Sequence, residues 1–143
     1  MKIQQISLFA ENKPGHIAAP ARLLAQEGID IRSLYLADTQ QYGILRMIVS
    51  NWEKAAALLE SQGFVVKVTE VLAVEVLDRP GGLADILEAL DGTGINIEYM
   101  YAFPNACEDR AILIFRFSDP DAAIARLQTA DINLLASEEL LRK

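Results

Sequence analysis

Two Pro-Gly turns carry the clearest chemistry in this sequence. Residues 13–15 read Lys-Pro-Gly and residues 79–81 read Arg-Pro-Gly, and each tripeptide precedes a stretch with helical periodicity. A turn that enters a helix leaves backbone N–H groups without helical partners, here near residues 15–17 and 81–83, and the helix N-terminus adds partial positive charge. Such a place accepts a carboxylate. We therefore predict two carboxylate-binding turns.

Polar residues elsewhere in the chain could hold the opposite charge. Asp30 carries a carboxylate, and the side-chain carbonyls of Asn12 and Asn96 can accept hydrogen bonds from an ammonium group. A carboxylate held at one end and an ammonium at the other is the recognition signature of a free amino acid. The competing interpretation is structural, because Asn and Asp are also common turn formers.

The two turns belong to a unit that occurs twice. Shifting residues 14–35 by 66 positions gives eight identities: Pro14/Pro80, Gly15/Gly81, Ala18/Ala84, Leu24/Leu90, Gly28/Gly94, Ile29/Ile95, Ile31/Ile97 and Tyr35/Tyr101. Beyond residue 43 the offset becomes 68, so the second copy carries two extra residues, which we place in the turn-rich segment 103–109. A duplicated unit usually forms a pseudo-symmetric pair, with functional sites where the copies meet.

Each copy predicts the same order of elements. In the first copy a strand, a helix, two strands and a second helix are expected at residues 3–10, 14–27, 29–37, 42–49 and 50–62. Gly28 is placed to end the first helix in a left-handed conformation. Pro20 lies inside that helix, which predicts a late start or a kink. The segment Ser50–Glu53 predicts a capping box for the second helix.

The apolar run 64–77 is long for one strand, so we divide it into the last strand of the first copy and the first strand of the second. Each copy then reads β-α-β-β-α-β, the ferredoxin-like pattern. We predict an α+β fold of two such modules with antiparallel sheets, at residues 1–68 and 69–143. The second strands, near 31–36 and 97–103, are apolar on both faces, so we expect the modules to join edge to edge, within one chain or in a homodimer.

Two motifs recur in the copies. They read Pro-Gly-x-Ile and Gly-Ile-Asp-Ile in the first copy, and Pro-Gly-Gly-Leu and Gly-Ile-Asn-Ile in the second. Together they resemble the ACT domain, a small-molecule-binding regulatory module. The resemblance spans nearly the whole chain as two tandem modules. The first copy is especially similar to the serine-binding regulatory domain of phosphoglycerate dehydrogenase. The architecture also resembles the glycine-cleavage repressor type, which has no enzyme domain.

The resemblance implies that the ligand is held by the loop after the first strand and by the start of the second strand of a neighbouring module. The loop position maps to Asn12 and Asp78, and the strand position maps to Asp30 and Asn96. A histidine that the family carries two residues before the loop position is absent from both copies, and Ala10 replaces it in the first. This replacement argues against serine without excluding another amino acid.

The two sites differ in charge if the copies pair head to tail about a pseudo-twofold axis. Asn12 then meets Asn96, and Asp78 meets Asp30. We expect the amide-rich site to bind a zwitterion more tightly, because two carboxylates repel the carboxylate of the ligand. If the copies instead pair with their own kind across a homodimer, Asn12 meets Asp30.

The predicted ligand-binding residues come from the two loops, the two strand starts and one edge strand: Asn12, Lys13, Pro14, Gly15, His16, Ile17, Asp30, Asp78, Gly81, Gly82, Leu83, Asn96 and Tyr99. His16 is the only histidine and could contact a ligand or simply lie at the surface. Tyr99 could line a pocket, although aromatic residues on a paired edge more often pack.

Composition narrows the class of protein. A net charge of −7 argues against nucleic acid as a partner. No apolar run approaches the roughly 20 residues of a membrane span, and the N-terminus lacks the core of a signal peptide. One cysteine cannot form an internal disulfide, which fits a cytoplasmic protein.

No nucleophile–base pair, paired general acid and base, or metal cluster is visible, so we predict no catalytic residue, no metal and no cofactor. The leading interpretation is a non-catalytic amino-acid sensor that acts on a partner enzyme or regulator. The alternatives are an acylphosphatase-like enzyme, an RNA-recognition module on the same fold, and a protein-interaction regulator without its own ligand.

Overall fold

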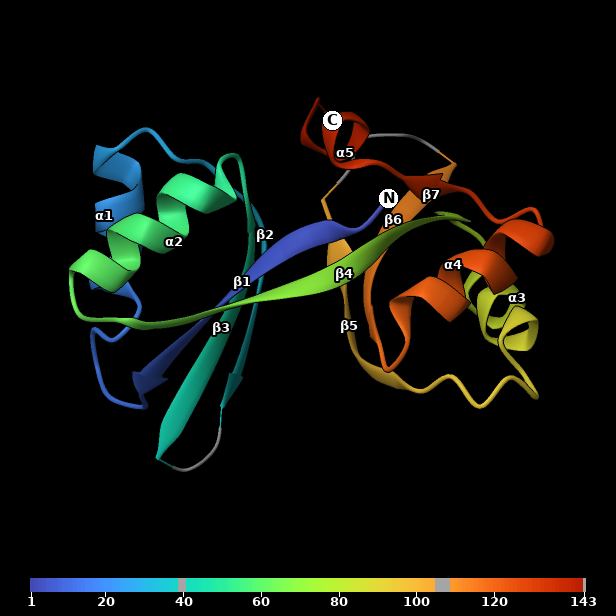
Figure 1. Ribbon diagram of the computed structural model, residues 1–143, viewed down its shortest axis with the longest axis horizontal. Coiled ribbons are helices and arrows are strands. Elements are labelled where there is room, and N and C mark those ends of the chain that lie inside the picture. Colours follow the sequence, from blue (N-terminus) through green and yellow to red (C-terminus); the bar gives the residue numbers. More distant parts are fainter. Residues whose placement is uncertain (39–40, 105–108, 143) are drawn as a thin grey trace. The chain divides into compact units, whose positions relative to one another are not determined.

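The computed structural model describes residues 1–38, 41–104 and 109–142 (Figure 1). Residue contacts divide the chain into two compact units, one of residues 4–69 and the other of residues 70–143 with residues 1–3. We call these the N-terminal unit and the C-terminal unit. The tip of the predicted hairpin at 38–41 and most of the predicted insertion at 103–109 lie outside the described residues.

The N-terminal unit follows the predicted order of elements. It contains β1 (Ile3–Glu11), α1 (Ala18–Gln26), β2 (Ile31–Asp38), β3 (Tyr42–Val49), α2 (Trp52–Ser61) and the first part of β4 (Val65–Leu77). The strands lie in the order β2-β3-β1-β4, and β3 is antiparallel to β1 and to β2. This is the strand order of the ferredoxin-like fold, which confirms the predicted fold class.

Helix α1 begins late, as the proline predicts. It starts at Ala18, so Pro20 occupies the third helical position, where an N–H would have no partner within the helix. The helix is followed by Gly28 at φ +70°, which confirms the predicted left-handed end.

The capping box predicted at Ser50–Glu53 is wrong by one residue. The N-cap of α2 is Asn51, whose Oδ1 accepts a hydrogen bond from the Lys54 N–H at 3.2 Å. Ser50 instead bonds to Asp30. Its Oγ accepts from the Asp30 N–H, and its own N–H donates to the Asp30 carbonyl oxygen, each at 3.0 Å. A tertiary contact with the start of β2 therefore takes the side chain that local sequence assigned to the helix.

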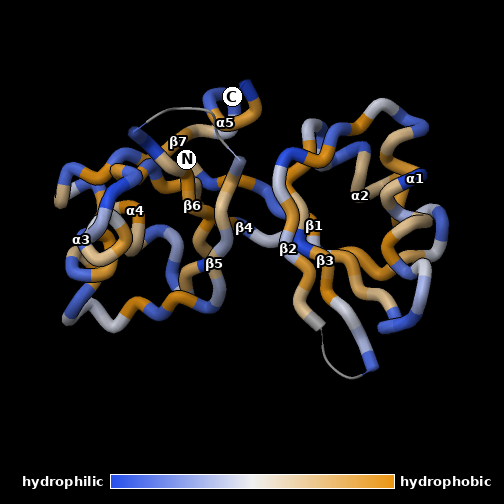
Figure 2. Tube along the Cα trace, turned by 180° about the vertical axis from the view of Figure 1, so that it is seen from behind, coloured by the Kyte–Doolittle hydropathy of each residue, from blue (hydrophilic) through white to orange (hydrophobic). Residues whose placement is uncertain are grey.

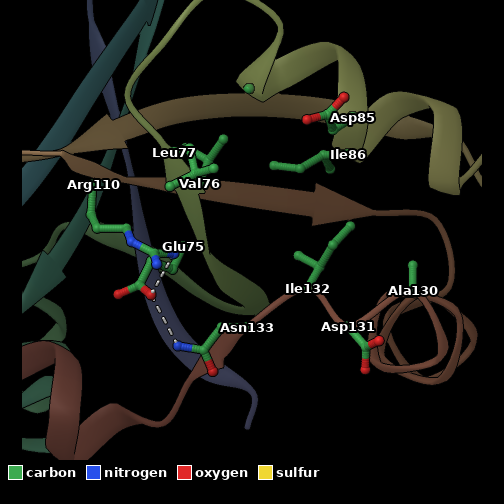
Figure 3. A pocket seen from close by; sticks show the side chains of 11 residues that line it. Glu75, Val76, Leu77, Asp85, Ile86, Arg110, Ala130, Asp131, Ile132 and Asn133 are labelled. Carbon is green, nitrogen blue, oxygen red and sulfur yellow. Dashed lines mark hydrogen bonds and ion pairs between the residues drawn. The ribbon is translucent and has the colours of Figure 1, made fainter.

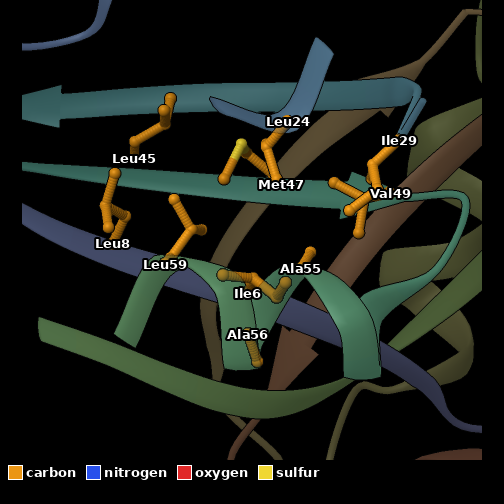
Figure 4. Close-up of a cluster of buried hydrophobic side chains, with 10 residues drawn as sticks. All are labelled: Ile6, Leu8, Leu24, Ile29, Leu45, Met47, Val49, Ala55, Ala56 and Leu59. Atoms are coloured by element: carbon orange, nitrogen blue, oxygen red, sulfur yellow. The ribbon is translucent and has the colours of Figure 1, made fainter. Parts of the chain in front are cut away.

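The core of the N-terminal unit lies between the sheet and its two helices. The pairing of β1 with β3 sets Ile6 opposite Met47 and Leu8 opposite Leu45, and all four side chains are buried. Figure 4 shows them beside residues of α1, of α2 and of the turn before β2. The buried cluster comprises Ile6, Leu8, Leu24, Ile29, Leu45, Met47, Val49, Ala55, Ala56 and Leu59. Full burial of each large aliphatic side chain contributes roughly 1.5–3 kcal/mol.

The C-terminal unit repeats the arrangement with the second part of β4 as its first strand. It continues with α3 (Gly82–Ala89), β5 (Ile97–Phe103), β6 (Arg110–Phe117), α4 (Pro120–Thr129), β7 (Leu134–Leu135) and α5 (Ser137–Arg142). Here β4 pairs with β6 and β7, and β6 pairs with β5, all antiparallel. The short helix α5 was not predicted, because six residues are too few to show helical periodicity.

The C-terminal core mirrors the N-terminal one. It comprises Leu72, Val74, Val76, Ile86, Leu90, Phe115, Phe117, Ala123, Leu127 and Leu134. The rings of Phe115 and Phe117 stack with centroids 5.2 Å apart. These two phenylalanines hinted at an RNA-stacking surface, but both are fully buried and so cannot stack on bases.

Strands β2 and β5 are the outermost strands of their units. In Figure 2 hydrophobic residues run along the strands while hydrophilic residues gather at the turns. On β2, Leu34 and Leu36 are 53% and 44% exposed. The predicted apolar edge is therefore present, whereas the predicted joining of edges stays a prediction.

Candidate ligand-binding site

Both Pro-Gly loops are tied to a neighbouring strand or turn by the same kind of bond. The Asn12 N–H donates to the Gln41 carbonyl oxygen at 2.8 Å, and the Asp78 N–H donates to the Asp109 carbonyl oxygen at 2.9 Å. Both residues are exposed. The two predicted loop positions therefore have equivalent backbone settings but different side chains, an amide in one unit and a carboxylate in the other.

The N-terminal loop turns tightly into α1. The His16 N–H donates to the Lys13 carbonyl oxygen at 3.2 Å, and Gly15 between them has φ +82°, which glycine adopts without strain. The N–H groups of Gly15 and Ile17 have no acceptor among the described residues. Of the donors predicted at residues 15–17, the turn uses one and leaves two for a ligand or water.

The C-terminal loop repeats this turn with one difference. The Gly82 N–H donates to the Arg79 carbonyl oxygen at 3.0 Å, and Gly81 has φ +92°. Gly82 is buried, and a Cβ at this position would meet the Leu77 carbonyl oxygen and, at 2.9 Å, the Val76 Cγ2. This glycine, predicted as a ligand contact, has a clear structural role in the close approach of α3 to β4.

A cavity of about 340 Å³ opens beside the N-terminal loop. Residues 13–16 form one wall, and the other wall includes the apolar side chains of Phe9, Ala10, Ala19 and Phe64. Lys13, Pro14, Gly15 and His16 were predicted, whereas the apolar wall was not. Phe64 lies far from the loop in sequence, and only the packing of the α2–β4 turn brings it there.

Charged and polar groups surround the mouth of this cavity. The Lys13 Nζ lies 3.7 Å from Glu11 Oε2, and both side chains are about two-thirds exposed. Such an exposed ion pair contributes little to stability, so Lys13 can turn to an incoming anion at small cost. The His16 imidazole lies against β3, since a Cβ placed on Gly43 would be 3.7 Å from its Nε2.

The predicted strand position of the N-terminal unit, Asp30, is anchored at the end of β3. Its N–H and carbonyl oxygen both bond to Ser50, as described above, and its carboxylate lies 3.6 Å from the Arg32 Nε. Asn96 has the same two backbone bonds to Ser118, each at 2.9 Å. Both serines were missed as anchors, although their match at the 68-residue offset was a usable signal.

The other predicted residues occupy different surroundings. Tyr99 is half-buried on β5 in register with Arg116, whose guanidinium lies 3.0 Å from a carboxylate oxygen of Glu98. Leu83 is exposed on the first turn of α3. Asn96 lines a shallow depression of about 370 Å³ with residues of the α3–β5 turn.

A second cavity, of about 290 Å³, lies beside the loop of the C-terminal unit (Figure 3). Of the predicted residues, Gly82 lines it. Its charged lining residues are Glu75, Asp85, Arg110 and Asp131. None of these four was predicted. Two of them come from distant parts of the sequence, Arg110 from strand β6 and Asp131 from the α4–β7 turn.

Two negative findings concern the residues at 1–38, 41–104 and 109–142. No group of three His, Cys, Asp or Glu side chains there could hold a metal ion. None of the helices there combines the length and apolar character that crossing a membrane takes.

The fold defines this chain as a pair of ferredoxin-like modules, each with a Pro-Gly loop that enters its first helix. A family model described as the ACT domain pair matches residues 1–143. The chain therefore belongs to the ACT domain pair family. The finer resemblance to the regulatory domain of phosphoglycerate dehydrogenase stays a prediction.

Solved structures share this fold. Protein BT0572 from Bacteroides thetaiotaomicron is 36% identical, with 100% of this chain and 98% of that chain covered and a TM-score of 0.93. The regulatory subunits of aspartate kinase from Thermus thermophilus and Thermus flavus are each 21% identical and have TM-scores of 0.64 and 0.60. Coverage is 89% of this chain and 91% of the first subunit, and 90% of each chain for the second. No curated protein matches the sequence.

Proposed function

We propose that this protein is a non-catalytic regulatory protein that binds a free amino acid at the Pro-Gly loop of its N-terminal unit. The observation that carries the proposal is the combination, in one cavity, of the unused Gly15 N–H, a lysine and an apolar wall. ACT domain pairs are typical of regulatory ligand-binding proteins, and two proteins of similar fold are regulatory subunits of aspartate kinase.

Each part of a zwitterion has a candidate partner in this cavity. The Gly15 N–H, the start of α1 and Lys13 favour a carboxylate. The Glu11 carboxylate, at the same rim, can accept from an ammonium group. A small or medium aliphatic side chain fits against Phe9 and Phe64. Asn12 and Asp30 remain proposed contacts that a neighbouring module would complete.

The proposed mode of action is allosteric. A ligand that binds one arrangement of the modules more tightly than another shifts the population toward it. We propose a partner enzyme or regulator as the recipient of that change, a homodimer as the working assembly and the cytoplasm as the location. The paired modules and the single cysteine support these proposals.

The test is a thermal-shift screen with the standard amino acids, followed by calorimetry on any that stabilise the protein. Binding to the folded state alone raises apparent stability. Lys13→Ala should weaken binding by about fivefold, the value of a partly exposed charge contact. The matched control is Lys54→Ala, which removes a lysine with a similar ion pair, 3.6 Å from Glu27, in the same unit.

Equal affinities in the two variants would contradict the proposed site. No binding of any amino acid at millimolar concentration would contradict the proposed function and favour a protein-interaction regulator of the glycine-cleavage-repressor type.

A further inference from the structure

Helix α3 presents large apolar side chains to solvent, whereas none of the large apolar side chains of α1 is exposed. Leu83 and Leu87 are 40% and 41% exposed and lie one helical turn apart, so they share a face of α3. Leu87 lines the same shallow depression as Ile97, which places this face beside the edge strand β5. An exposed apolar helix face next to a sheet edge indicates an interaction surface.

The charges around this face are negative. Asp85 lies 3.3 Å from the Arg79 guanidinium, which compensates its charge. Glu88 and Asp91 are exposed and form no ion pair with another residue in the described part of the chain. Leu87 therefore has two uncompensated carboxylates close to it in the sequence of the helix and its C-terminal turn, and a cationic partner would be favoured there.

The equivalent face of α1 has the opposite charge and smaller side chains. The 66-residue offset gives three pairs of equivalent positions on the two helices: Ala21 and Leu87, Arg22 and Glu88, and Ala25 and Asp91. Arg22 is exposed, forms no ion pair with a described residue and is the one charged residue in the sequence of α1. The face of α1 is thus basic and narrow, whereas that of α3 is acidic and bulky.

The adjoining edge strands show the reverse order of size. Leu36 of β2 is 44% exposed and lies opposite Leu45, a residue of the core beneath the helices. Its equivalent on β5 is Ala102, which lies opposite Leu113 at the edge of the other core. The N-terminal unit thus has its larger side chain on the strand and the C-terminal unit has it on the helix, so the two surfaces are complementary in shape.

These differences favour the contact of unlike units over that of like units. Two α1 faces would bring Arg22 near a second Arg22 and leave space between alanines, and two α3 faces would bring Glu88 near a second Glu88. An α1 face against an α3 face brings opposite charges together and sets Leu87 against Ala21. Like-charge contacts of this kind suppress the wrong pairing.

We propose that α3 of one chain docks against α1 of a second copy of the chain, beside the edges of β5 and β2. Leu87 packs on Ala21, and Glu88 and Asp91 lie close to Arg22. The second copy is the occupant because Leu83 and Leu87 remain exposed in the single chain. This inference rests on the proposed homodimer and goes beyond it by naming which units meet.

The test is cross-linking of single-cysteine variants with a short bis-maleimide, in a Cys107→Ser background. Ala21→Cys and Leu87→Cys are treated separately and as an equal mixture that has been allowed to exchange subunits. We expect cross-linked dimers in the mixture and few in either variant alone, because residue 21 of one chain faces residue 87 of the other. The matched controls are Ala57→Cys and Ala125→Cys, exposed alanines at equivalent positions of α2 and α4, which should not cross-link in any combination.

Charge reversal gives a second measurement. Arg22→Glu and Glu88→Arg should each raise the dissociation constant of the dimer about tenfold, since each brings like charges together. The double variant should regain most of the loss, because it restores opposite charges. The control is Glu60→Arg, which reverses an exposed charge on α2 and should leave the dissociation constant unchanged. Sedimentation equilibrium measures all four variants.

Two results would overturn the proposal. One is cross-linking of Ala21→Cys or Leu87→Cys alone that is as efficient as in the mixture, which would show that like units meet. The other is a double charge variant that dimerises no better than the single variants. A chain that stays monomeric would contradict the homodimer and this docking together. Absence of amino-acid binding in calorimetry would contradict the proposed sensor and leave the cross-links unchanged, so the two failures are distinguishable.

Discussion

His16 and Gly82 occupy the same position of the repeat, but the first position has room for a side chain and the second does not. The His16 side chain extends over Gly43 and lines a cavity. At Gly82 the space that a Cβ would need is taken by the Leu77 carbonyl oxygen of β4, so only glycine fits there without a shift. The same backbone turn therefore carries a side chain in the N-terminal unit and allows a close approach of α3 to β4 in the C-terminal unit.

This contrast predicts the effect of an added methyl group. Gly82→Ala should lower the free energy of unfolding by roughly 1–3 kcal/mol, because the new Cβ meets backbone that cannot move freely. Gly43→Ala is the matched control, since its Cβ would meet side-chain atoms only at 3.5 Å or more, and we expect a change below about 1 kcal/mol. Urea denaturation of both variants measures the difference, and equal midpoints would refute the account.

At the scale of elements, the second helix of each unit begins with a side-chain cap. Asn51 caps α2 and Asp119 caps α4, each accepting from the N–H three residues later. The serines before them, Ser50 and Ser118, hold the start of the second strand. Helix start and strand anchor thus occupy adjacent residues in both units.

Removal of a cap distinguishes this arrangement from the capping box. Asn51→Ala should cost about 1 kcal/mol of stability, because one helix N–H loses its acceptor. Glu53→Ala should change stability by no more than about 0.5 kcal/mol, since Glu53 does not return a bond to Ser50. Thermal unfolding of both variants is the measurement. A loss of stability in Glu53→Ala as large as that in Asn51→Ala would indicate that the capping box forms after all.

At the scale of the whole molecule, the edge strand β2 offers a surface for assembly. Leu34 and Leu36 expose apolar area on an outermost strand, and such strands tend to pair unless they are protected. We propose this edge as the contact of the homodimer.

Leu34→Lys tests that proposal, because a charged side chain on an edge strand opposes pairing. Light scattering after size exclusion should find a dimer in the unchanged protein and a monomer in the variant. The control is Val65→Lys, which places the same charge at another strongly exposed apolar position, at the start of β4. A dimer that survives Leu34→Lys, or dissociates equally with Val65→Lys, would argue against this edge.

The sequence by itself determined the fold class and the place of the two loops. The signals were local or periodic: the alternation of apolar residues in 3–10, the glycine after each first helix and the 66-residue offset. Such signals can be recognised in the sequence without the folded structure. For the same reason Pro20 predicted a late start or a kink in the first helix, and α1 starts late, at Ala18. Of the candidate site, the sequence identified the loop wall formed by residues 13–16.

Only the tertiary structure decided which side chains face those loops. Phe64 reaches the N-terminal cavity through the α2–β4 turn, and Glu75 meets Arg110 and Asn133 because antiparallel pairing joins residues far apart in the chain. Ser50 likewise bonds to Asp30 across 20 positions instead of capping its own helix. Contacts of this kind depend on strand register and on the packing of helix ends, and no spacing in the sequence encodes them.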